Sequence, residues 1–238
     1  SCVLLFYISR LSSVPFAYLW FTYLSCYFIT RDLGVIRLAI ASHLIVIFFL
    51  QRKFIWQAVS IIIASVGFQY FALVAILAKP FSRIKIDWFS ILLLFVFSYV
   101  CAKFISFENV KFLLPEDRVN NYAGSAVVQA SGFSILVPMA RNLFFASFLY
   151  LLMKSEIRLR RYRLWVWSAF FSVSFYIMAS GILVVAQRFS AFFGAVLPLA
   201  LAFLMQRQSI RNDRFYLVAT VCVLNFLSLF YFNSWIWR

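Results

Sequence analysis

Long apolar runs separated by short polar or basic connectors make up most of the chain. Most runs are long enough to cross a hydrocarbon core about 30 Å thick, which takes about 20 helical residues, and a helix satisfies its own backbone polar groups in lipid. We therefore predict an all-α fold, a polytopic transmembrane helix bundle of about eight membrane segments that forms a single integral membrane domain over residues 1–238. The predicted segments are 11–30, 33–50, 54–78, 88–105, 126–153, 164–187, 189–206 and 215–236.

The composition excludes several classes of protein. Hydrophobic residues make up 65% of the chain and charged residues only 12%, against about 25% charged in soluble domains. These proportions exclude an ordinary cytosolic enzyme, a disulfide-stapled secreted domain and a disordered chain. The excess of 22 Lys and Arg over 7 Asp and Glu would suggest a nucleic-acid partner in a soluble protein. Here most basic residues lie between apolar runs, so we expect them to orient the chain among membrane lipids, with no nucleic-acid partner.

The basic connectors predict the orientation of the segments. Connector 154–163 holds five basic residues and one acidic residue, which is typical of a cytoplasmic loop. Counted outward from it, connectors 79–87 and 207–214 are also cytoplasmic, and the polar stretch 106–125 is an outer, periplasmic loop. The nine residues before Arg10 are too few to cross a bilayer. We interpret them as the tail of an earlier span and expect the chain to be a fragment of a longer protein.

Segment 54–78 does not fit this orientation as an ordinary span, because it would carry the basic residues of 51–53 to the outer side. A segment that enters from the cytoplasmic side, turns near residues 67–69 and returns would satisfy the rule. We therefore predict a re-entrant or broken helix here. A single tilted span is the alternative.

Arg141 is the strongest candidate for a functional residue, because it lies inside an apolar segment. It precedes Lys154 by 13 residues within segment 126–153, which places it about 20 Å from the inner surface at about 1.5 Å per residue. An ionisable residue at that depth costs about 2.5–3.5 kcal/mol to insert and marks a functional site by default. Pro138 is expected to loosen the helix beside it.

Three further arginines are predicted on the same outer side. Arg37 begins a helix, and Arg118 belongs to the outer loop. Arg188 lies at a tight outer connection between segments 164–187 and 189–206. For Arg37 and Arg188 the alternative is that they only snorkel to the headgroups. Four guanidiniums suit an anionic ligand, because each presents a fork of donors to phosphate oxygens, and a ligand that approaches from the membrane favours a lipid-linked diphosphate.

Acid–base and metal-binding candidates are sparse. His43 is the only histidine, and it lies about 240° around a helix from Arg37, so the two do not share a face. A lone membrane histidine is more often packed or hydrogen-bonded against a neighbouring helix. Asp32, Glu116 and Asp117 are weak candidates for a proton acceptor. The four cysteines stand in no metal-binding spacing, and the HExxH, GxSxG, Walker and GxGxxG motifs are absent from the sequence, so we expect no metal and no cofactor.

Four stretches of the sequence occur in an order that points to a family resemblance. They are RLAIA from Arg37, IASVGFQYFAL at 63–73, DRVNNY at 117–122 and QRFSAFFGAVLPLAL at 187–201. Together, over about residues 31–206, they resemble the EpsG-like group of bacterial Wzy-type polysaccharide polymerases. That group carries an RxGIA-type helix start, an HxxAL segment, a Tyr-bearing outer loop and a late Arg-x-x-x-Tyr/Phe-Phe helix.

The resemblance implies a multi-pass protein of the bacterial inner (cytoplasmic) membrane that polymerises O-antigen, capsule or exopolysaccharide. It would transfer a growing glycan from undecaprenyl diphosphate to a sugar hydroxyl of another lipid-linked repeat unit at the periplasmic face. The expected partners are this undecaprenyl-diphosphate-linked oligosaccharide, membrane lipids and other polysaccharide assembly proteins. We predict catalytic roles for Arg37, Arg141 and Arg188. The residues expected to bind substrate are Gln69, Arg118, Tyr122 and His43.

The chain departs from the family pattern in two places. Gln69 stands where the family has the histidine of HxxAL, and an amide can donate hydrogen bonds but cannot act as a base at neutral pH. The family's N-terminal motifs do not occur in this sequence, which agrees with the fragment interpretation. Two alternatives stay open. A transporter or flippase of lipid-linked or anionic solutes would use the same arginines for binding alone, and an assembly subunit would use them only for orientation.

Overall fold

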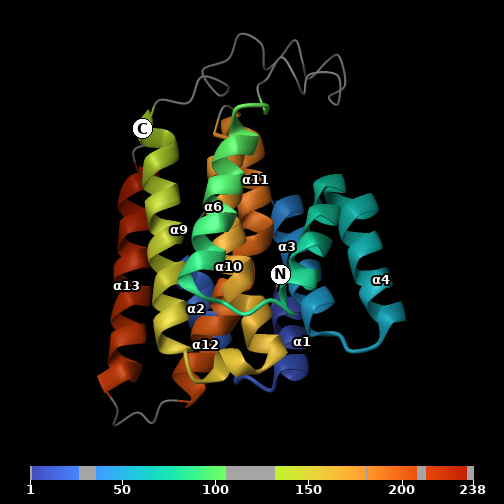
Figure 1. Ribbon diagram of the computed structural model, residues 1–238. Coiled ribbons are helices and arrows are strands. Elements are labelled where there is room, and N and C mark those ends of the chain that lie inside the picture. Colours follow the sequence, from blue (N-terminus) through green and yellow to red (C-terminus); the bar gives the residue numbers. More distant parts are fainter. Residues whose placement is uncertain (1, 27–35, 106–131, 181, 208–212, 235–238) are drawn as a thin grey trace. The chain divides into compact units, whose positions relative to one another are not determined.

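Helices dominate the computed structural model of the chain. The structure describes residues 2–26, 36–105, 132–180, 182–207 and 213–234. Within these ranges every regular element is a helix, which confirms the predicted all-α class (Figure 1). The chain forms two compact units. The first unit combines Ser1–Ala75 with Ala195–Arg238, and the second unit is Ile76–Gly194.

The first unit begins with two helices joined by a sharp turn. α1 spans Cys2–Ser12 and α2 spans Phe16–Tyr23, so the predicted segment 11–30 begins too early. The cause is local. Ser13 has a left-handed φ of 60°, and Pro15 immediately before α2 has no backbone N–H with which to continue a helix. The apolar run before the turn therefore forms a helix of its own.

Hydrogen bonds tie α2 and the short π-helical stretch that follows it, residues 24–26, to distant helices of the same unit. These helices are α12 (Leu197–Arg207) and α13 (Asp213–Ser234). The Thr22 hydroxyl lies 2.8 Å from the carbonyl oxygen of Pro198, close enough to donate to it. Asn225 Nδ2 donates to the carbonyl oxygen of Ser25 at 2.7 Å. Thr22 and Asn225 are buried, so these bonds satisfy polar groups that would be costly to leave unpaired in an apolar interior.

The segment predicted to be re-entrant or broken is interrupted. α4 covers Phe54–Ile62 and continues as a π-helical stretch, η2, over Ile63–Phe68. Gln69 is then extended, with φ −153° and ψ 105°, and a 3-10 helix, η3, follows over Tyr70–Leu77. In Figure 1 the chain rises along α4 and then runs back. Gly67, a poor helix former, stands just before the break. The side of a membrane from which the segment enters stays a prediction.

α10 is the centre of the second unit. It spans Arg160–Met178, and every residue from 164 to 176 is buried. The helices that contact it are α5 (Ala78–Phe81), α6 (Trp88–Ala102), α9 (Gly132–Leu152) and α11 (Leu183–Gly194) (Figure 1). Because neighbours surround it, the buried part of α10 carries apolar side chains around its whole circumference rather than along one stripe, with three buried serines among them.

Phenylalanine rings fill the contact between α10 and α11. Phe193 is fully buried and stacks on Phe175, with ring centroids 4.9 Å apart and planes 11° from parallel. The Phe171 ring lies 5.3 Å from that of Phe193, and the Phe189 ring lies 5.2 Å from that of Phe175. Phe189 and Phe193 are four residues apart and therefore share one face of α11. This face fixes how α11 is rotated in the second unit.

Several helices have the apolar character expected of a membrane protein. Ile91, Leu94 and Ser98 form the buried side of α6. The exposed side carries the apolar residues Trp88, Phe89, Leu92, Leu93, Val96, Phe97 and Val100. Soluble proteins rarely expose a contiguous apolar face of this kind. Two stretches, Ile135–Leu152 and Val185–Arg207, are long and apolar enough to cross a membrane, and several shorter apolar helices accompany them.

The predicted boundary between segments 164–187 and 189–206 is wrong. The prediction placed a tight connection at Arg188, the only charged residue nearby. The structure instead ends α10 at Met178 and begins α11 at Leu183, so Arg188 lies inside α11. The sequence between the two helices includes a Ser-Gly pair at 180–181. Ser and Gly have low helix propensity. This pair therefore predicts the interruption between the two helices better than the charged Arg188 does.

Candidate functional site

The described site residues are divided between the two units. The first unit holds Arg37, His43 and Gln69, and the second holds Arg141 and Arg188. The predicted outer loop 106–125 lies outside the described residues. With it lie the predicted site residues Arg118 and Tyr122 and the proton-acceptor candidates Glu116 and Asp117, and Asp32 is also outside the described ranges. The roles expected for those residues stay predictions.

A hydrogen bond between α9 and α11 brings Arg141 and Arg188 to the same level of the second unit. Asn142 Nδ2 donates to Ser190 Oγ at 2.8 Å, and Ser190 is buried. Arg141 adjoins Asn142, and Arg188 precedes Ser190 by two residues. A polar pair between two apolar helices fixes their register, because each group would otherwise need another partner in an apolar interior.

The two arginines leave their helices in different directions. Successive helical residues are turned by about 100°, so Arg188 lies about 200° around α11 from Ser190, which faces α9. Arg188 therefore points away from α9. Arg141 lies about 100° around α9 from Asn142. The register thus places Arg141 and Arg188 at one level of α9 and α11, with side chains that leave the two helices in different directions.

The guanidinium groups of the three arginines predicted to be catalytic are available to donate hydrogen bonds to a ligand. Among the residues that the structure describes, the guanidiniums of Arg37, Arg141 and Arg188 have no hydrogen-bond or ion-pair partner. Arg37 is exposed, and the other two are half-buried. A half-buried cation loses part of its hydration, so an anion with several oxygens would stabilise it more than it stabilises a fully hydrated side chain.

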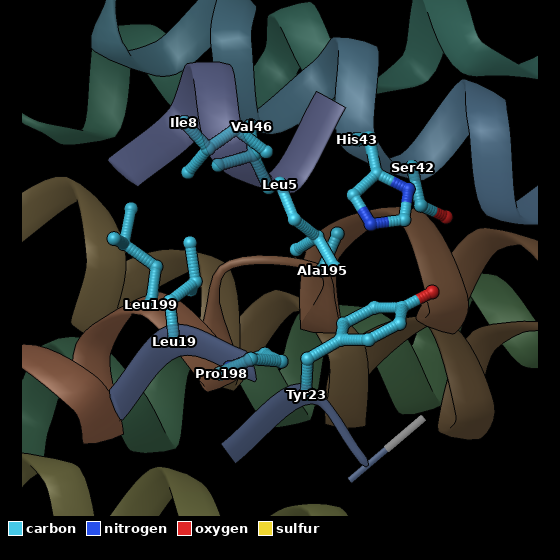
Figure 2. A pocket seen from close by; sticks show the side chains of 10 residues that line it. All are labelled: Leu5, Ile8, Leu19, Tyr23, Ser42, His43, Val46, Ala195, Pro198 and Leu199. Carbon is cyan, nitrogen blue, oxygen red and sulfur yellow. The ribbon is translucent and has the colours of Figure 1, made fainter. Parts of the chain in front are cut away.

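A small pocket lies inside the first unit, between α1, α2, α12 and α3, which spans Ile36–Leu50. Figure 2 shows its three polar side chains, Tyr23, Ser42 and His43, at one end of an otherwise apolar lining. The cavity volume is about 10 Å³, roughly the space that one water molecule needs. A sugar or a diphosphate does not fit into it.

His43 is a buried residue of this pocket. Its ring is 3% exposed and lies 4.9 Å from the Tyr23 ring. Nδ1 is 2.6 Å from the carbonyl oxygen of Ala39, and because a carbonyl only accepts, Nδ1 carries the proton in the neutral ring. These contacts fit a histidine packed against a neighbouring helix, which was the alternative considered from the sequence. Substrate binding by His43 stays a prediction.

Gln69 occupies the break in the segment that begins with α4. Its backbone N–H donates to the carbonyl oxygen of Ala64 at 2.8 Å, and its carbonyl oxygen accepts from the N–H of Ala72 at 2.8 Å. The backbone at the break is therefore satisfied on both sides. The Gln69 side chain is half-buried, and its predicted role in substrate binding stays a prediction.

Sequence reasoning missed the polar residues that position the candidates. Asn142 and Ser190 were not singled out, although an asparagine next to an arginine inside an apolar run is itself an unusual signal. Ser42 and Tyr23 were missed because a serine and a tyrosine are common in apolar helices. Among the described residues, no group of three His, Cys, Asp or Glu side chains is arranged to hold a metal ion.

Comparison with known proteins gives one result. No curated protein and no solved structure matches the chain significantly. The profile of the EpsG family matches residues 1–238 of the chain. The match therefore includes the four stretches that carry the resemblance. This family consists of bacterial membrane proteins linked to exopolysaccharide biosynthesis. The chain therefore belongs to the EpsG family.

Proposed function

We propose that this protein is a polysaccharide polymerase of the bacterial inner membrane. It lengthens a glycan by transferring it from undecaprenyl diphosphate to a sugar hydroxyl of another lipid-linked repeat unit, at the periplasmic face. Family membership over the whole chain supports the pathway. The observation that carries the chemistry is Arg141, a half-buried guanidinium within an apolar helix that has no protein partner among the described residues.

The proposed reaction makes and breaks one bond to the sugar. The acceptor hydroxyl oxygen bonds to the anomeric carbon of the growing glycan, the bond from that carbon to the diphosphate oxygen breaks, and the hydroxyl proton passes to water. Negative charge therefore builds up on the departing diphosphate. Preorganised guanidinium donors in a site of low dielectric stabilise such charge more in the transition state than in the substrate.

Arg141 and Arg188 lie at one level of neighbouring helices, which suits a ligand that extends past both. Because their side chains diverge, each would contact a different part of the diphosphate or the sugars next to it. Arg37 belongs to the other unit and is exposed. Its proposed role rests on its position in the RLAIA stretch, which resembles the helix start of the family.

Single substitutions in the complete protein test this function. Arg37→Ala, Arg141→Ala and Arg188→Ala are each compared by the length of the glycan made in cells that lack the natural gene. Loss of one charge-stabilising donor is expected to lower the polymerisation rate about 10²–10³-fold, and lysine at the same position should restore part of it. Arg52→Ala, an exposed cation on a predicted cytoplasmic connector, is the matched control.

The outcome also separates the alternatives. A polymerase variant still exports single repeat units that are not joined. If the protein is a transporter or flippase, the same variants would fail to export even single units. The interrupted segment around Gln69 is the feature that favours this alternative, because broken helices are typical of transporters. Unchanged glycan length in all three arginine variants would leave only an assembly role and would refute the proposed site.

A further inference from the structure

Two segments of the second unit, which include α5, the first turn of α10 and the turns beside them, together form a strongly basic cluster. Its members are the basic residues of segments 79–87 and 154–163, namely Lys79, Arg83, Lys85, Lys154, Arg158, Arg160, Arg161 and Arg163. These segments contain only two acidic residues, Asp87 and Glu156, so their formal net charge is +6. We refer to these eight residues as the basic cluster.

Hydrogen bonds hold the two segments of the basic cluster together. Arg160 Nε donates to Ser82 Oγ at 2.9 Å. The Arg163 guanidinium donates to the carbonyl oxygen of Arg83 at 3.2 Å and to that of Arg158 at 3.1 Å. These acceptors are a hydroxyl and backbone carbonyls, which carry no charge. These bonds therefore fix the Arg160 and Arg163 guanidiniums in place without neutralising their charge.

The charges of the basic cluster act on one another. Burial lowers the pKa of the Lys79 ammonium, and the nearby Arg160 guanidinium lowers it further. A neighbouring cation has this effect because it disfavours the charged form. The Asp87 carboxylate accepts a hydrogen bond from the N–H of Ser90 at 2.7 Å, where it caps α6. Two carboxylates cannot balance eight cations, so an anion bound in the cluster would relieve the repulsion.

An exposed apolar surface begins directly beside the basic cluster. α6 follows Asp87, and its first two residues, Trp88 and Phe89, are 64% and 74% exposed. Ile84 and Leu159, inside the two basic segments, are also exposed. A ligand that meets both surfaces needs a phosphate for the cations and hydrocarbon for the apolar face. A phospholipid has both, whereas a soluble phosphate or a nucleic acid would leave the apolar surface in water.

We propose that the basic cluster binds the headgroup phosphate of an anionic phospholipid, with the acyl chains against the exposed face of α6. Arg83 and Lys85 make the main contacts, because both side chains are exposed and precede α6 by only a few residues. The fixed guanidiniums of Arg160 and Arg163 complete the positive surface behind them. This site does not depend on the proposed polymerase chemistry.

The test is native mass spectrometry of the full chain purified in a neutral detergent. The protein is titrated with dioleoyl-phosphatidylglycerol, with dioleoyl-phosphatidylcholine and with glycerol 3-phosphate. The variant R83Q/K85Q is compared with R52Q/K53Q, an exposed basic pair in the first unit whose replacement removes the same charge. We expect tighter binding of the anionic lipid than of phosphatidylcholine. R83Q/K85Q should weaken binding of the anionic lipid about tenfold, and R52Q/K53Q should not change it.

Three results would overturn the proposal. Equal affinity for the two lipids would show that the phosphate charge is not recognised. An equal loss in the two double variants would show that total charge, rather than the basic cluster, attracts the lipid. Glycerol 3-phosphate bound as tightly as the lipid would assign the site to a soluble phosphate. Native spectra report lipid bound to folded monomers, so unfolding of a variant does not imitate any of these results.

Discussion

The hydrogen bond from Asn142 to Ser190 fixes the register in which Arg141 and Arg188 lie at one level of α9 and α11, and its strength can be measured. The donor and acceptor are 2.8 Å apart, and the serine is 3% exposed. A net contribution of about 0.5–1.5 kcal/mol is usual for such a bond, and polar pairs between membrane helices average about 0.6 kcal/mol with a maximum near 1.7 kcal/mol. We therefore expect a coupling free energy of about 1 kcal/mol.

A double-mutant cycle isolates that coupling. Ser190→Ala leaves the half-buried Asn142 amide without its partner, and Asn142→Leu leaves the buried Ser190 hydroxyl without one. Each single change should lower the free energy of unfolding by about 1–2 kcal/mol. The double variant leaves neither group unpaired, so its loss should be smaller than the sum of the single losses by about 1 kcal/mol. Unfolding in mixed micelles, followed by tryptophan fluorescence, gives the four free energies.

Ser174→Ala is the matched control for this cycle. Ser174 is 1% exposed, and its hydroxyl has no hydrogen-bond partner among the described residues. Removing it should leave stability unchanged or raise it. If the losses of the Asn142 and Ser190 variants add within about 0.3 kcal/mol, the bond does not hold the helices together. The inferred register of Arg141 against α11 would then be wrong.

Three further predictions concern the second unit. Phe193→Ala should lower the free energy of unfolding by about 3–5 kcal/mol, because it leaves a cavity against Phe175 in a fully buried contact. Phe193→Leu should lower it much less, and thermal unfolding in detergent compares the two variants. Arg163→Lys keeps the charge but cannot reproduce the several hydrogen bonds of the guanidinium to backbone carbonyls, so it should lower the melting temperature. An unchanged melting temperature would show that these bonds do not stabilise the fold. The hydrogen bond from the N–H of Ser90 lowers the pKa of Asp87, so the stability that this carboxylate contributes is complete above about pH 3.9, the ordinary Asp pKa. It is lost as the pH falls through the lower pKa of the folded state, and Asp87→Ala should remove this part of the acid sensitivity in pH-dependent melting curves.

The all-α class followed from the sequence because a run of apolar residues without regular alternation, between basic connectors, has few other structures open to it. The break at Gln69 was also predictable, since the charge pattern at 51–53 favoured a re-entrant or broken helix over a single tilted span. The helix boundary near Arg188 was not. Charge predicts where a chain meets water only when the charged residue is not itself part of a site, and we propose that Arg188 is part of one. Small residues, such as the Ser-Gly pair at 180–181, were the better guide.

The candidate site could be predicted only residue by residue. Arg141 stood out because an arginine inside an apolar run needs an explanation. Its partner helix could not be deduced, because helices of similar composition can pack in many registers. The register depends on side chains such as Asn142 and Ser190, whose role appears only when both are placed in space. His43 shows the opposite case, since a residue that is conspicuous by type is packed in a pocket that has room for one water molecule.

The basic residues of the second unit act in two physically different settings. In the basic cluster, Arg160 and Arg163 are held by a hydroxyl and by backbone carbonyls, which makes a permanent positive surface suited to a lipid that stays bound. Arg141 and Arg188 have no such supports among the described residues, so an anion that binds them can also leave, as a substrate must. The two functions should therefore separate. R83Q/K85Q is expected to lose anionic lipid and keep long glycans, and Arg141→Ala is expected to keep the lipid and lose them. Loss of both properties in either variant would mean that lipid binding and polymerisation share one site.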